Sequence, residues 1–205
     1  VILRSTDGGS SWRLLISGTT ERLEAVSFPT STHGFIAGRN GVFLETQDAG
    51  DNWTSISLGP DDNKDVLFTS STLGFVAGGN GLMRTSDGGA TWNTVLSSNI
   101  VELEDLDFRN NSGVAVGEDG NIYSSDDNGV TWTLDTMFMA MMSLEFNDVA
   151  FIDSLGIVAV GEAGYIAHQF VSGGSNISIS ERENIETRIF PNPADKHLHF
   201  ELPIG

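Results

Sequence analysis

The sequence predicts an all-β protein, a β-propeller whose four-stranded antiparallel blades repeat about every 40 residues. A Ser/Thr-x-Asp-x-Gly-x-x-Trp motif occurs four times and contains every tryptophan of the chain. These tryptophans, Trp12, Trp53, Trp92 and Trp132, are 41, 39 and 40 residues apart. A fixed period of this length indicates stacked supersecondary units, and no stretch shows the 3.6-residue apolar period of a helix.

Each unit contains four short runs that are typical of strands. The first ends in a phenylalanine, and these phenylalanines are Phe28, Phe68, Phe108 and Phe151. The second ends at a Gly-x-x-Gly turn, as at Gly38 and Gly41. The third runs into the Asp motif, and the fourth begins at the tryptophan. Runs of β-branched and aromatic residues bounded by Gly, Asn and Asp predict strands joined by tight turns.

The Asp motif is expected to build the turn between the third and fourth strands. Its aspartates are Asp7, Asp48, Asp87 and Asp127. Each carboxylate can accept hydrogen bonds from backbone N–H groups of the turn, and the glycine allows a positive φ. The tryptophan is expected to wedge between neighbouring sheets, where its ring buries a large apolar area. We therefore assign a structural role to these residues in preference to ligand binding.

The repeated motif resembles the Asp-box, or bacterial neuraminidase repeat. The stretch Gly74–Trp92 is most similar to propellers of the photosystem II assembly-factor type. The resemblance covers residues 1–171 and implies a partial blade, three full blades and a final blade without its Asp motif. It implies the fold; because such propellers occur in many non-photosynthetic proteins, the photosystem role is not carried over.

The two ends of the chain carry further expectations. Residues 1–4 stand where a third strand belongs, so we expect earlier blades upstream in a longer protein. We expect the last blade to take its outermost strand from the other end of the chain. Residues 172–187 are expected to be a linker, since they include Gly173-Gly174-Ser175.

Residues 188–205 resemble the opening of the C-terminal sorting domain of the type IX secretion system. The motif is Pro191, Asn192 and Pro193, followed by an alternating strand with Leu198, Phe200 and Leu202. The resemblance implies export by the secretion machinery of a Gram-negative bacterium, and thus a secreted or cell-surface protein.

Composition excludes several kinds of function. The chain has 28 Asp and Glu against 10 Lys and Arg, a formal charge of −18, which argues against nucleic acid and anionic membranes as partners. It has no cysteine, so disulfides and thiolate metal sites are excluded. No apolar run is long enough to span a membrane.

Catalytic and metal sites are weakly indicated. A sialidase would need an arginine cluster and a tyrosine nucleophile, whereas the chain has only Tyr123 and Tyr165. A two-carboxylate glycosidase stays open, although Asp65, Asp105 and Asp148 follow the repeat and suggest a structural duty. Asp126-Asp127-Asn128-Gly129 is oxygen-rich but completes no calcium loop. We expect no cofactor, no metal and no catalytic residue.

One face of the propeller is the candidate binding surface. The turns between second and third strands share it with the connections from one blade to the next. It carries Arg39, Asn40, Asn80, Glu118, Asp119, Glu162 and a methionine-rich insertion that includes Met139 and Met141. Flexible methionines suit adaptable binding surfaces, although the insertion also suits a plug for the central channel.

These observations predict an exported, non-catalytic module that binds a protein or polysaccharide. A carbohydrate-active hydrolase and a periplasmic assembly factor are the alternatives.

Overall fold

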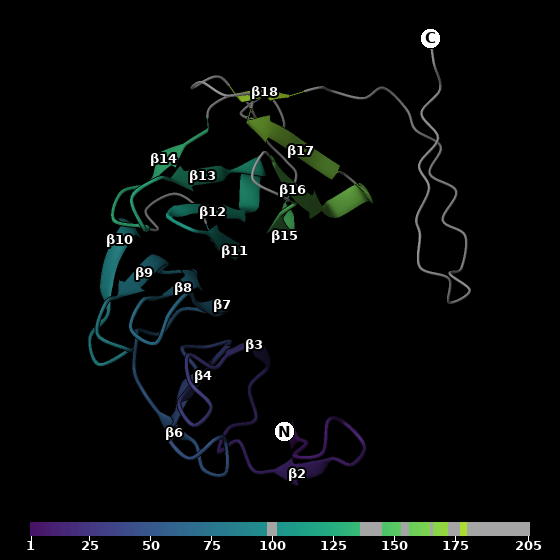
Figure 1. Ribbon diagram of the computed structural model, residues 1–205, viewed down its shortest axis with the longest axis vertical. Helices are drawn as coiled ribbons and strands as arrows, with labels where there is room; N and C mark the ends of the chain where they lie inside the picture. Colours follow the sequence, from purple (N-terminus) through teal and green to yellow (C-terminus); the bar gives the residue numbers. More distant parts are fainter. Residues whose placement is uncertain (98–101, 136–144, 153–155, 165, 172–176, 180–205) are drawn as a thin grey trace.

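The computed structural model describes residues 1–97, 102–135, 145–152, 156–164, 166–171 and 177–179. Five antiparallel sheets follow one another along an arc, as the prediction of an all-β propeller required (Figure 1). Within each four-stranded sheet the strands run in chain order from the inner to the outer side of the arc, and we name them strands A to D.

The blades are numbered along the chain. Blade 1 consists of β1 (Ile2–Arg4) and β2 (Arg13–Leu15), which hold the positions of strands C and D. The other blades are four-stranded. Blades 2 and 3 contain, in order, β3 (Leu23–Ser27), β4 (Gly34–Gly38), β5 (Phe43–Thr46) and β6 (Thr54–Ser55), then β7 (Asn63–Phe68), β8 (Gly74–Gly78), β9 (Gly81–Thr85) and β10 (Asn93–Ser97). Blade 4 contains β11 (Leu103–Arg109), β12 (Ser112–Gly117), β13 (Ile122–Ser125) and β14 (Thr133–Leu134). Blade 5 contains β15 (Phe146–Phe151), β16 (Gly156–Gly161), β17 (Ile166–Val171) and β18 (Ile177–Ile179). Short 3₁₀ turns, η1 (Glu118–Gly120) and η3 (Glu162–Gly164), join strands B and C of blades 4 and 5.

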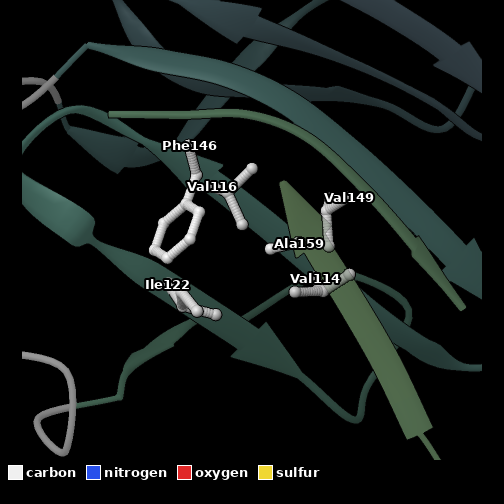
Figure 2. Packing of buried hydrophobic residues seen from close by; sticks show 6 residues of the cluster. All are labelled: Val114, Val116, Ile122, Phe146, Val149 and Ala159. Carbon is white, nitrogen blue, oxygen red and sulfur yellow. The ribbon is translucent and has the colours of Figure 1, made fainter. Parts of the chain in front are cut away.

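The core consists of apolar clusters between adjacent blades. Figure 2 shows the cluster between blades 4 and 5, where Val149 from strand A of blade 5 faces Val114 and Val116 from strand B of blade 4. Equivalent clusters bring Leu106 onto Phe75 and Ala77, and Val66 onto Phe35 and Ala37. Strand B is therefore the surface on which the next blade packs, and burying these side chains is the main stabilising contribution.

The Asp motif forms the turn between strands C and D, as the sequence predicts. In blade 3, Asp87 accepts hydrogen bonds from the Thr91 backbone N–H at 2.9 Å and from the Thr91 and Thr85 hydroxyls at 2.6 and 2.7 Å. These bonds hold the pKa of Asp87 at about 2. The Thr85 hydroxyl also accepts a bond from the N–H of Gly89, whose φ is +92°. The turn is thus closed by two side chains that share one hydrogen-bond network.

Two tryptophans wedge between blades as expected, and Trp12 does not. Trp92 meets Phe35 and Phe43 of blade 2 edge-on, with ring centroids 6.2 and 5.5 Å apart, and Trp132 makes the same contact with Phe75 of blade 3 at 6.5 Å. Trp12 instead leaves 62% of its surface exposed. The expectation of a wedge is not met at Trp12, which lies between no two of the described blades.

Blade 5 also differs from the expectation. Its fourth strand is β18, whose Ile177, Ser178 and Ile179 pair antiparallel with Val171, Phe170 and Gln169 of β17. Residues 177–179 lie within the range that composition assigns to a linker. Gly and Ser favour a linker only locally, whereas the free edge of β17 offers a row of backbone partners. The last blade is completed from the adjoining segment and not from the other end of the chain.

Candidate functional site

Strand A of every four-stranded blade contains a β-bulge at the same place. The register with strand B shifts at Glu24 in blade 2, Lys64 in blade 3, Glu104 in blade 4 and Asn147 in blade 5. A bulge inserts one unpaired residue and re-aims its side chain, and bulges are over-represented beside functional sites. Four consecutive blades therefore present a polar side chain at one repeated position. We call these four residues the bulge ring.

The glycine that ends strand B makes this geometry possible. A Cβ at Gly78 would overlap the carbonyl oxygen of Asp62, and one at Gly117 would overlap that of Glu102. The same carbonyls accept hydrogen bonds from Gly79 at 2.9 Å and from Glu118 at 3.1 Å. The Gly-x-x-Gly turns thus lie directly against the connections that lead into strand A. Together, these turns and connections form the connector face.

Lys64 links two members of the bulge ring. Its Nζ lies 2.7 Å from Glu104 and 3.0 Å from Glu102, both in blade 4, and only 12% of its side chain is exposed. Burial lowers the pKa of Lys64, but its bonds to Glu104 and Glu102 outweigh burial and raise the pKa overall. The lysine is therefore charged and neutralised within the protein.

Arg39 neutralises Glu24, the bulge-ring residue of blade 2, in the same way. Its guanidinium donates to Glu24 at 2.6 Å and lies 3.9 Å from Asp62 at the entrance to blade 3. The backbone N–H of Asn40 donates to Asp62 at 2.8 Å, and its side-chain amide donates to Glu21 at 2.6 Å. The first two predicted binding residues thus hold the blade 2 turn against the two flanking connections.

The blade 4 and blade 5 side of the connector face is rich in carboxylates. Glu118 and Glu162 lie at the B–C turns, and their backbone N–H groups donate to the carbonyls of Glu102 and Glu145. Burial raises the pKa of Glu145, and the charges of Glu104, Glu162 and Glu118 raise it further. These carboxylates are close enough to interact, and Lys64 is the cation that acts on Glu145.

The structure brings most of the predicted binding residues to this face. Asp119 lies in the blade 4 turn with a φ of +56°, and Asn80 lies against Gly59 of the preceding connection. Met139 and Met141 are outside the described residues. Sequence reasoning missed Glu24, Lys64 and Glu104, although their 40-residue spacing was visible, because a bulge appears only when strand pairing is known.

Two partly buried carboxyl groups lie next to the bulge ring. Burial raises the pKa of Asp65 to about 6 and, together with the charge of Asp65, raises that of Asp105 to about 8. Asp105 accepts a bond from the Val149 backbone N–H of blade 5 at 2.7 Å, and Asp65 bonds to the backbone of Val66 and Leu106. These bonds join strand A of one blade to strand A of the next, in agreement with the structural duty that the repeat suggested.

Other kinds of site find little support in the part of the chain that the structure describes. There, no group of three or more His, Asp or Glu side chains is arranged to hold a metal ion. No helix within the described ranges has the length and apolar character needed to cross a bilayer.

Comparison with known proteins agrees with this architecture. The family model described as photosynthesis system II assembly factor YCF48 matches residues 1–64. A structure of YCF48 bound to a D1 peptide shares 22% identity, with a TM-score of 0.60, over 78% of this chain and 55% of that one. The chain has the β-propeller fold, and its first 64 residues are similar to BNR-type repeats. YCF48 from Cyanidioschyzon merolae gives 20% identity and a TM-score of 0.64 over 85% of this chain and 61% of that one.

The same fold occurs in enzymes. The GH74 xyloglucanase from Xanthomonas campestris has 13% identity and a TM-score of 0.64, over 82% of this chain and 33% of the enzyme. No curated protein sequence matches the chain. The propeller described here spans between half and two thirds of the length of the two YCF48 chains.

Proposed function

We propose that this propeller is a non-catalytic interaction module that binds a protein partner through the connector face. The observation that carries the proposal is the bulge ring, which repeats one polar position across four blades and places it beside the B–C turns. On this face the acidic side chains outnumber the basic ones: Glu24, Glu104, Glu118, Asp119 and Glu162 stand against Lys64 and Arg39. The structure of YCF48 with a D1 peptide supports a peptide ligand, since it is a propeller of the same fold.

The charge of the face suggests what kind of segment binds. Lys64 and Arg39 are already paired with carboxylates of the protein itself. The charges of Glu118 and Glu162 both repel that of Glu145, so a cation placed beside Glu145 would relieve that repulsion. The partner segment is therefore one that carries lysine or arginine, and electrostatic attraction would also speed its association.

A labelled lysine-rich peptide tests this proposal by fluorescence polarisation with the 205-residue chain. The variants are Glu145→Gln on the connector face and Asp126→Asn on an Asp-motif turn, which change the net charge equally. We expect Glu145→Gln to weaken binding several-fold more than Asp126→Asn, with the difference shrinking at high salt. Equal effects of the two substitutions would mean that the peptide responds only to the net charge of the protein, and would contradict binding at the connector face.

A glycoside hydrolase is the second candidate. It is favoured by the likeness to the xyloglucanase and by the raised pKa values of Asp65 and Asp105, which are those of carboxyl groups that donate protons. Both groups are engaged with backbone between blades, so we rank this function second. Release of reducing sugar from xyloglucan, lost on Asp105→Asn in a variant of unchanged fold, would reverse the ranking.

We also propose that the protein is exported, on the basis of the motif in its C-terminal tail. Pro191, Asn192 and Pro193 lie outside the described residues, and their sequence resembles a sorting signal. Fusing residues 172–205 with the remainder of a sorting domain to a reporter should carry the reporter to the surface of a bacterium with type IX secretion. A periplasmic reporter would instead favour the assembly-factor alternative.

A further inference from the structure

Adjacent four-stranded blades are joined by side chains of one strand A that accept hydrogen bonds from backbone N–H groups of the next strand A. These strands form the inner side of the arc, and we call each contact between adjacent blades a seam (Figure 1). Between blades 2 and 3 the acceptor is the Ser27 hydroxyl, 3.0 Å from the Phe68 nitrogen. In the next two seams the acceptors are carboxyl groups. They are Asp65 between blades 3 and 4, and Asp105 and Asp107 between blades 4 and 5.

Asp65 and Asp105 are also bonded to other carboxyl groups. The Asp65 side chain hydrogen-bonds to that of Asp105, which in turn bonds to that of Asp148 in blade 5. A hydrogen bond between two carboxyl groups needs a proton on one of them, because ionised carboxylates only accept. These three residues, which we call the carboxyl chain, therefore hold protons across both seams of blade 4. The Ser27 hydroxyl does not ionise in the pH range of carboxyl groups.

The charges that face Asp105 come from the two neighbouring strands A. Burial raises the pKa of Asp105, and the charges of Asp65 from β7 and Asp148 from β15 raise it further, to about 8. The N–H of Val149 favours the ionised form of Asp105, but its effect is smaller than that of burial. Burial likewise raises the pKa of Asp65 to about 6. The closed seams thus keep protons that carboxyl groups in water would release.

The residues beside the carboxyl chain are neutral or already paired. The cross-strand partners of its first two members are Ala77 in β8 and Val116 in β12, which carry no charge. The nearest cation along the chain is Lys64, whose amine is paired with Glu104 and Glu102.

We propose that the two seams of blade 4 open only with release of protons from the carboxyl chain, so that they part more readily as the pH rises, whereas the seam between blades 2 and 3 does not respond. In an opened seam the carboxyl groups are in water and titrate near their ordinary pKa of 3.8. Opening therefore becomes easier with rising pH, up to about 6 for Asp65 and about 8 for Asp105.

The connector face is built on the same strands. Asp105 and Asp148 directly follow the bulge-ring residues Glu104 and Asn147. Opening the seam between blades 4 and 5 would separate these two members of the bulge ring. The shape of the connector face at blades 4 and 5 thus depends on pH.

Amide hydrogen exchange tests the proposal. The exchange of the 205-residue chain is followed by NMR between pH 5 and 8 and corrected for the intrinsic exchange rate at each pH. The probes are the seam N–H groups of Phe68, Leu106 and Val149. We expect protection to fall about tenfold at Leu106, more than about tenfold at Val149, and less than about threefold at Phe68. Equal losses at all three would mean that the protein opens as a whole, and they would overturn the proposal, as would unchanged protection at Val149.

Two substitutions in one seam locate the effect. Asp105→Asn keeps an oxygen to accept from Val149 but cannot ionise, so the protection of Val149 should stay within about threefold from pH 5 to pH 8. Asp107→Asn is the matched control, because Asp107, two residues further along β11, accepts from the backbone N–H groups of Phe108 and Phe151. This variant should keep the loss of protection seen in the parent. A loss that Asp105→Asn leaves unchanged, or that Asp107→Asn removes, would show that the carboxyl chain does not control the seam. The pH series of the parent decides the proposal without either variant.

Discussion

The amine of Lys64 lies 2.7 Å from the carboxylate of Glu104, the residue that holds the same position in the next repeat. The two side chains come from successive bulges, and 12% and 14% of them are exposed. The same position of the repeat thus carries opposite charges in blades 3 and 4, and the ion pair between them joins the two blades. A sheltered pair of this kind is costly to break from one side, because the remaining charge stays partly desolvated.

The tryptophans of the Asp motif should differ strongly in their contribution to stability. Trp92→Ala removes a ring that contacts phenylalanines of two blades, and we expect it to lower the free energy of unfolding by roughly 2–4 kcal/mol. Trp12→Ala removes a ring that is 62% exposed and should cost less than about 1 kcal/mol. Urea unfolding of both variants measures the difference. Similar losses would mean that the tryptophan acts through its own turn and not between blades.

The repeat predicted the fold because strand alternation and turn chemistry are local properties. Phe28 and Trp53, for example, mark strand ends whatever the neighbouring blade is. The bulge ring could not be predicted, since Glu24 and Lys64 become bulge residues only through their register with strand B. The exposure of Trp12 and Val26 likewise depends on which blade lies next to them, and β18 depends on the free edge of β17.

The glycines of the Asp motif should separate backbone strain from crowding. Gly129 and Gly8 both have a φ of +70°, but a Cβ at Gly129 would overlap the Phe75 ring of the preceding blade, whereas Gly8 has open space. Gly8→Ala should cost about 1 kcal/mol for the positive φ. Gly129→Ala should cost a further ~1–3 kcal/mol from overpacking. Thermal melts of the two variants under the same conditions test this. Equal losses of stability would contradict the close approach of Gly129 to the Phe75 ring.

The partly buried carboxyl groups predict that stability falls as the pH rises from 3.8 to about 8. The folded pKa values of Asp65 and Asp105 are raised to about 6 and 8 from the ordinary 3.8. The folded protein therefore keeps protons that the unfolded chain releases. Their contribution is fully present below pH 3.8 and is lost as the pH rises through 6 and then 8.

Replacing Asp105 tests this directly. Asp105→Asn keeps an oxygen to accept from Val149 and cannot ionise, so it should stabilise the protein by on the order of 2 kcal/mol at pH 8 and much less at pH 5. Asp126→Asn is the exposed control, and it should leave the change of the melting midpoint with pH the same as in the parent. A parent melting midpoint that is flat between pH 5 and 8.5 would show that these carboxyl groups are ionised without cost.

Two truncations should distinguish the last strand from the tail. Deleting residues 180–205 should barely change the melting midpoint. Deleting residues 172–205 also removes β18 and exposes the edge of β17, so we expect an earlier melt and some aggregation. Indistinguishable melts would return residues 177–179 to the linker that the sequence indicated.

The connector face is the centre of this account, and hydrogen exchange with a lysine-rich peptide tests it most directly. We expect peptide-dependent protection at the start of β15 and in the turns around Glu118 and Glu162, and none in the Asp-motif turns at residues 87–91 and 126–131. The same experiment with Glu145→Gln should show weaker protection at all three connector segments. Protection of the Asp-motif turns, or protection that Glu145→Gln leaves unchanged, would contradict the assignment of this face as the binding surface.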